Sequence, residues 1–191
     1  MGARLAVVAV LAAAVGALLA AAFLKPPADV PVQDVVTTSR PAPFATRVPV
    51  SRVQTASRPA ALEIPAIGVD TGTIVGLGLT PDGALERPKD ARTPGWFTGG
   101  PTPGERGPAV LAARSDEPGA FRRLTDARPG EQVVVHRADH TAAVFTVYRV
   151  DHPPAPFATA RSATPAPELR LITVGGDNVV VYARLSQAFA N

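Results

Sequence analysis

The stretch Leu169-Arg170-Leu171-Ile172-Thr173-Val174-Gly175-Gly176 decides how the rest of this chain is interpreted. Apolar and β-branched residues fill the run up to Val174, and two glycines then end it, which is the pattern of a strand followed by a turn. A second run, Asn178 to Leu185, follows after only Gly175-Gly176-Asp177. The pattern predicts two strands with a short connection as the end of the folded domain.

Upstream of this pair, short apolar runs alternate with turn signals from Ala61 onward. The 21 prolines and 16 glycines also disfavour a helical protein. The residues therefore predict an all-β domain with short helical turns, a small barrel or sandwich, over residues 61–187. The expected elements are strands at 62–65, 73–77, 108–113 and 169–174, a helical turn at 121–124, and a hairpin in which 132–137 and 143–150 flank the turn Ala138-Asp139-His140-Thr141.

The N-terminal segment, residues 1–25, predicts a membrane anchor. Twenty residues from Leu5 to Leu24 carry no charge and lie between Arg4 and Lys25, a length that suits a membrane-spanning helix. The basic N-terminal flank predicts an extracytoplasmic location for the rest of the chain. Cleavage near Ala20-Ala21-Ala22, as in a signal peptide, is the alternative. Residues 26–60, rich in scattered prolines, are expected to form a flexible linker.

The composition excludes several classes of function. The net charge is only +3, and no basic stripe with interleaved aromatic residues is present, which argues against nucleic-acid binding. The chain contains no cysteine, so disulfides and thiolate metal sites are excluded. Asp116-Glu117 is the nearest approach to a metal motif and has no third ligand at suitable spacing. Neither a metal nor a cofactor is predicted.

Several segments, taken in order over residues 58–187, resemble class F sortases, the cysteine transpeptidases of actinobacterial cell surfaces. The resemblance implies a closed sortase-like β-barrel behind an N-terminal transmembrane helix. Besides the opening stretch, the matching segments are Ile64-Pro65-Ala66-Ile67-Gly68-Val69, Gly95-Trp96-Phe97 with Gly99-Gly100-Pro101, Gly107-Pro108-Ala109-Val110-Leu111-Ala112, Phe121-Arg122-Arg123-Leu124 before Arg128-Pro129-Gly130, and Asn178-Val179-Val180-Val181-Tyr182-Ala183.

The same resemblance implies that the catalytic residues of the family are missing. The family's nucleophilic cysteine follows Leu-Ile-Thr, where this chain has Val174, and a valine side chain has no lone pair for attack. The family's general-acid histidine stands in a run similar to Leu-Ala-Gly-His-Val-Asp; here Arg114 occupies that position. A guanidinium stays protonated and cannot exchange a proton in turnover. The family also has an arginine that stabilises the oxyanion, and strand register places Asn178 at that position. The connection before it, Gly175-Gly176-Asp177, is several residues shorter than is usual in the family.

The chain has other residues with side chains suited to catalysis or binding. Ser115-Asp116 with one of the three histidines would suggest a serine hydrolase, but no Gly-x-Ser-x-Gly motif is present and the histidine spacing does not converge on Ser115. Trp96, the only tryptophan, and Thr173 are candidates for lining a groove.

The leading hypothesis is an inactive pseudo-sortase, a membrane-anchored extracytoplasmic domain that acts by binding. A sorting-signal-like peptide or an active sortase is the expected partner. Two alternatives stay open: a hydrolase or transpeptidase of the sortase type with an unrecognised nucleophile that is not cysteine, and a structural surface module.

Overall fold

The computed structural model describes residues 48–49 and 53–190. The chain divides into two compact units, residues 1–41 and 42–191, and all of the described residues belong to the second. Among these residues, none of the helices is long and apolar enough to span a bilayer. The predicted anchor, residues 1–25, and most of the predicted linker, residues 26–60, lie outside the described part of the chain. The predicted end of the linker is wrong, because residues 59 and 60 already belong to strand β2, which pairs with β7.

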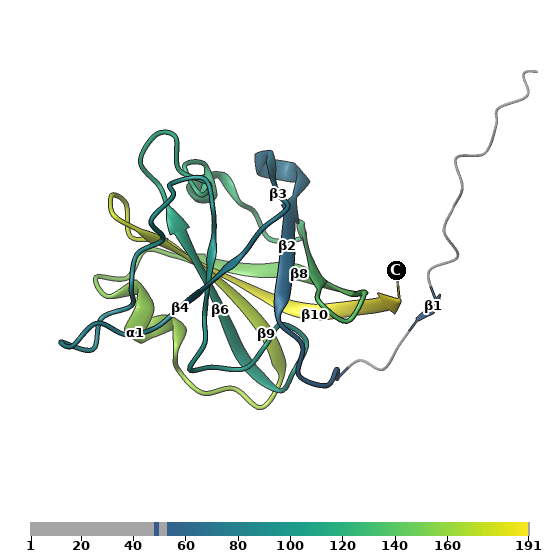
Figure 1. Cartoon of the computed structure of the whole chain (residues 1–191). Helices are drawn as coiled ribbons and strands as arrows, with labels where there is room; N and C mark the ends of the chain where they lie inside the picture. Colours follow the sequence, from purple (N-terminus) through teal and green to yellow (C-terminus); the bar gives the residue numbers. More distant parts are fainter. Residues whose placement is uncertain (1–47, 50–52, 191) are drawn as a thin grey trace, which may run out of the picture. The chain divides into compact units, whose positions relative to one another are not determined.

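One curled sheet makes up most of the described domain (Figure 1). Its long strands are those with continuous apolar sequence, whereas the short ones are flanked by glycine or proline. The strands are β1 (Val48–Pro49), β2 (Pro59–Ile64), β3 (Val69–Thr71), β4 (Val75–Leu77), β5 (Gly95–Phe97), β6 (Gly107–Arg114), β7 (Gln132–Arg137), β8 (Thr141–Asp151), β9 (Pro167–Val174) and β10 (Val180–Ala190). Three short helical elements join them: η1 (Pro65–Ile67), η2 (Leu124–Asp126) and α1 (Pro156–Ala160).

The strand order is β3-β2-β7-β8-β10-β9-β6-β5-β4, with β1 paired to β10. The all-β prediction with few helices is confirmed. The predicted closure is wrong for the hydrogen-bonded sheet, because this path has two ends, β3 and β4. Each end strand has only three residues and one partner, β2 for β3 and β5 for β4. The sheet therefore curls without closing through backbone hydrogen bonds.

The two faces of the curled sheet bury separate apolar clusters, as the alternation of side chains along a strand requires. Along β6, Ala109, Leu111 and Ala113 join the larger cluster, whereas Val110 and Ala112 join the smaller one. The larger cluster also takes in Phe121, Phe145 and the inward residues of β2, β7, β8, β9 and β10. The smaller cluster lies against α1, whose Ala160 and Phe157 pack onto it.

A buried ion pair connects β9 to α1 and the segment that follows it. Glu168 and Arg170 are each 4% exposed, and the Arg170 Nη2 lies 3.0 Å from a Glu168 carboxylate oxygen. The Arg170 Nη1 also donates to the carbonyls of Ala160 and Ser162, at 2.9 and 2.7 Å. The pair therefore fixes the segment after α1 against the smaller apolar cluster.

Candidate functional site

The two residues predicted to replace a nucleophile and a general acid are register neighbours. Strands β6 and β9 run parallel, with Ala113 opposite Thr173 and Arg114 opposite Val174. Both side chains lie at the carboxyl end of their strand, and in a parallel pair these ends meet at one edge. The structure thus brings together two positions that are 60 residues apart in the sequence.

Arg114 is held by the turn that follows its own strand. Its Nε donates to Asp116 Oδ1 at 2.8 Å, and a second guanidinium nitrogen donates to the other carboxylate oxygen. These hydrogen bonds hold the pKa of Asp116 below its usual value, and the charge of Arg87 adds to that effect. The same pair raises the pKa of Arg114. Position 114 therefore carries a permanent positive charge, which can attract an anion or a carbonyl oxygen but cannot shuttle a proton.

Val174 lies against the smaller apolar cluster, on the same face of β9 as Ile172. The chain then turns through Gly175 and Gly176, whose φ angles of 76° and 95° are in the left-handed region that favours glycine. The Ser115 hydroxyl donates to the carbonyl of Gly175, which ties the turn after β6 to the turn after β9. The position next to Arg114 is thus apolar and lies on a fixed backbone.

Thr173 is buried and belongs to the turn instead of an open groove. Its hydroxyl donates to the Asp177 carbonyl and accepts the backbone N–H of Val179 at 2.9 Å. The Thr173 N–H also donates to the carbonyl of Val179, so the antiparallel pairing of β9 and β10 extends to this point. Asn178 is therefore the next position opposite Val174, but its side-chain amide donates to the Pro154 carbonyl at 3.3 Å.

Trp96 lies on β5 opposite Leu111 and packs against the larger cluster, on the face of the sheet opposite to that of Val174. Its Nε1 donates to the carbonyl of Pro101 at 3.0 Å. The ring lines a hollow of about 150 Å³ that also includes Ile74 and Thr98. The structure places Trp96 beside a depression in the surface, but not next to the Arg114–Val174 pair.

One residue near this pair was missed by sequence reasoning. The Arg87 guanidinium lies so close to Gly175 that a Cβ at this glycine would collide with it. Arg87 comes from the long connection between β4 and β5, and no spacing in the sequence relates it to residues 114 or 174. Two guanidiniums, Arg87 and Arg114, therefore lie near the end of β9, and both contribute to the field at Asp116.

Among the described residues, Asp116 is bonded to Arg114, and no hydrogen bond joins Ser115 or Asp116 to His140 or His152. The hydroxyl of Ser115 is bonded to the Gly175 carbonyl. His136 lies on β7, where its Nε2 is 2.7 Å from Glu63 of β2. His140 is at the β7–β8 hairpin, with a φ of 61°. The contacts at Ser115 are those of a structural hydroxyl.

Comparison with known proteins supplies the family. The family model of the sortase domain matches residues 62–186. Solved structures with a similar fold include sortase A from Listeria monocytogenes, with 14% identity, a TM-score of 0.56 and coverage of 72% of this chain and 92% of that one. The SrtA sortase from Actinomyces oris has 20% identity, a TM-score of 0.55 and coverage of 74% and 87%. Sortase E from Streptomyces avermitilis has 16% identity, a TM-score of 0.52 and coverage of 71% and 92%. No curated protein matches the chain.

Proposed function

Since the chain belongs to the sortase family, we propose that it is a degenerate class F member that binds peptide or protein partners without transpeptidase activity. Residues 5–24 anchor it in the cell membrane, and the linker that begins at residue 26 and ends before β2 tethers the domain on the extracytoplasmic side. Class F is supported by the segments around Ile64–Val69, Gly107–Ala112 and Asn178–Ala183, in which the sequence resembles that class.

The observation that carries the proposal is the pairing of Arg114 with Val174 at the ends of β6 and β9. These are the positions that the family resemblance assigns to the histidine and the cysteine. A cysteine transpeptidase needs a thiolate to attack the peptide carbonyl and a group that returns a proton to the leaving amine. Valine supplies no nucleophile, and an arginine paired with Asp116 supplies no exchangeable proton.

A binding role is supported by what the domain keeps. Val174 occupies a strand position with apolar bulk close to that of cysteine, so β9 still packs against the smaller cluster. Leu111 and Leu171, opposite each other on β6 and β9, are both fully buried. The strands that carry Arg114 and Val174 thus belong to a well-packed domain, which supports a role in binding. Arg87 and Arg114 also leave positive charge beside Val174, which suits an acyl oxygen or a carboxylate of a bound peptide.

The test uses the full chain in detergent, titrated calorimetrically with a sorting-signal peptide that an active sortase cleaves in a parallel reaction. Mass spectrometry of the same sample then looks for products. We expect saturable binding without cleavage. Cleavage would show that the chain is an enzyme, and the Ser115→Ala variant would then test whether Ser115 is the nucleophile. A folded chain that does not bind the peptide would overturn peptide binding and favour a structural surface module.

A further inference from the structure

Strand β4 is an edge strand of the sheet, and the backbone groups on its outer side have no strand partner among the described residues. It is the last strand in the order and pairs, in parallel, with β5 alone. The Val75 N–H donates to the Pro94 carbonyl and the Thr98 N–H to the Leu77 carbonyl, both at 3.0 Å. Since alternate residues of a strand turn their backbone groups to opposite sides, the N–H and C=O of Gly76 point away from β5. Such an edge is a template for another strand.

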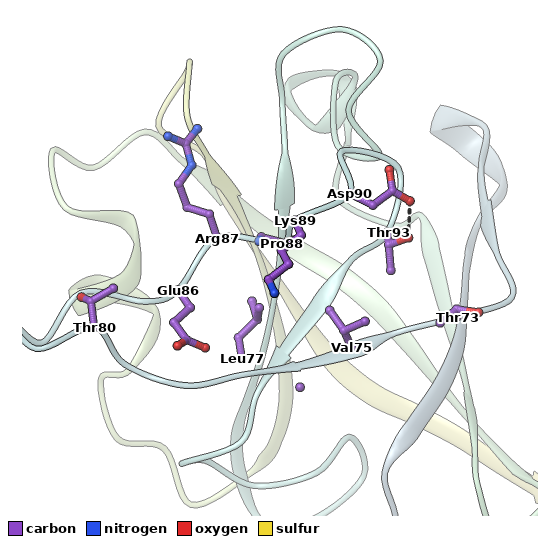
Figure 2. A pocket seen from close by; sticks show the side chains of 11 residues that line it. Thr73, Val75, Leu77, Thr80, Glu86, Arg87, Pro88, Lys89, Asp90 and Thr93 are labelled. Atoms are coloured by element: carbon purple, nitrogen blue, oxygen red, sulfur yellow. Dashed lines mark hydrogen bonds between the residues drawn. The ribbon is translucent and has the colours of Figure 1, made fainter.

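A hollow lies on each face of this edge. On one face, Val75 and Leu77 form the floor of a hollow of about 730 Å³, with the connection from Glu86 to Thr93 as its rim (Figure 2). On the other face, Ile74, Trp96 and Thr98 line the hollow of about 150 Å³. Both hollows include Val75 and Gly76. A strand added beside β4 would send alternate side chains toward opposite faces, and thus toward the two hollows in turn.

The acidic residues of the rim are engaged within the connection itself. A carboxylate oxygen of Glu86 accepts the Gly78 N–H at 2.7 Å. The Asp90 carboxylate accepts the Thr93 hydroxyl at 2.7 Å and the Arg92 N–H at 3.1 Å. The hydrogen bond from Thr93 is the main reason that the pKa of Asp90 lies below its usual value.

Three cations line the two hollows, and two of them, Lys89 and Arg58, lack such partners among the described residues, whereas Arg87 lies against Gly175. Lys89 lines the larger hollow and Arg58 the smaller one. In the part of the chain that the structure describes, neither side chain makes an ion pair. Figure 2 shows Lys89 reaching across the larger hollow toward β4. A carboxylate on either side of an added strand would therefore meet an available positive charge.

We propose that β4 is a docking edge for an extended acidic peptide, which adds to the sheet as a further strand. Gly76 supplies the backbone hydrogen bonds, Val75 and Leu77 an apolar floor, and Lys89 and Arg58 contacts for carboxylates on the two faces. Val75, which is 38% exposed, is one of two large apolar side chains that the described domain leaves exposed, and an added strand would cover it. Main-chain bonds with pockets for alternate side chains are the usual basis of such strand addition.

An extended peptide fits this edge better than a charged wall polymer or a lipid surface. Those partners would use the positive charges alone and would not need a strand edge. The docking edge uses neither Arg114 nor Val174, although Arg87, which lies against Gly175, also lines the larger hollow.

The test uses the fluorescence of Trp96, the only tryptophan in the chain and a lining residue of the smaller hollow. The full chain in detergent is titrated with a blocked heptapeptide in which valine alternates with glutamate. We expect a saturable change in Trp96 emission. The same peptide with glutamine in place of glutamate should bind about tenfold more weakly, because two or more charge contacts are lost.

Two further arms separate strand addition from simple charge attraction. Lys89→Ala and Arg58→Ala should each weaken binding of the glutamate peptide about threefold. Arg106→Ala is the control, because it also removes one positive charge. Arg106 immediately precedes β6, whereas Arg114 ends that strand, and its replacement should leave peptide binding unchanged. Two N-methylated peptides are compared, each carrying methyl groups on one of the two alternating sets of amides. One of the two should not bind, because its methyl groups remove the hydrogen bonds that the peptide donates to the edge of β4. Undiminished binding of both methylated peptides, or equal binding by the Lys89→Ala and Arg58→Ala variants, would overturn the proposal.

Discussion

A cysteine at position 174 would have Arg114, and not an imidazole, as its neighbour across the β6–β9 pair. A nearby guanidinium lowers the pKa of a thiol, so the thiolate would form readily. Attack on a peptide carbonyl would then stop at the step in which the leaving amine needs a proton. Arg114, fixed by two hydrogen bonds to Asp116, cannot provide that proton. If positions 174 and 114 are the catalytic positions, both residues therefore have to be changed together to give turnover.

We expect Val174→Cys alone to give a thiol that iodoacetamide modifies, but no turnover of a sorting-signal peptide. The Val174→Cys, Arg114→His pair should cleave the peptide at least about 100 times faster than the single variant, since a positioned general acid contributes that much. Arg114→His alone, which has no nucleophile, is the control. Product formation is followed by chromatography. Rapid cleavage by Val174→Cys alone would show that position 114 is not the general-acid position.

At the scale of the element, β9 and α1 depend on a buried charge pair. Replacing one partner leaves the other charge buried without compensation, which costs about 3 kcal/mol or more. We expect Glu168→Gln to lower the free energy of unfolding by about that amount, measured by urea denaturation. Arg123→Ala is the control, because it removes one member of the exposed ion pair between Arg123 and Asp126. It should change the free energy of unfolding by less than about 1 kcal/mol. Equal effects of the two variants would mean that water reaches the Glu168–Arg170 pair.

Elements with strong local signals could be predicted from the sequence, and those held by distant contacts could not. The hairpin around Ala138–Thr141 was predicted from its turn residues, and β7 and β8 confirm it. Strand β5 and helix α1, with three and five residues, carry too little periodicity to be recognised. Phe97 of β5 and Phe157 of α1 instead stabilise each other across the fold, with ring centroids 5.1 Å apart. Such elements exist because of tertiary packing.

At the scale of the whole molecule, the candidate site depends on pairings that local patterns do not contain. The sequence predicted strands ending at Ala113 and Val174, but only the family resemblance related residues 114 and 174. Their parallel pairing joins two strands between which the chain forms η2, β7, β8 and α1. The contact of Arg87 with Gly175 had no signal at all, because one arginine in a connection resembles any other. Strand pairing creates the first neighbourhood, and the β4–β5 connection brings Arg87 to the second.

The fold should therefore depend strongly on the central strands. Leu111 is fully buried on β6, opposite Leu171 of β9 and Trp96 of β5. We expect Leu111→Ala to reduce the free energy of unfolding by about 3 kcal/mol through a cavity in the larger cluster. Leu111→Met, which keeps the volume, should cost less than about 1.5 kcal/mol.

Urea denaturation of the full chain in detergent, followed by Trp96 fluorescence, measures both variants of Leu111. A single cooperative transition that shifts to lower urea in Leu111→Ala, with an unchanged slope, is the expected result. It would mean that the larger cluster stabilises one native state, as the proposed binding role requires. A broad transition whose midpoint does not change in Leu111→Ala would contradict this. It would mean that the domain has no cooperatively packed core and that the chain is the product of a decaying gene.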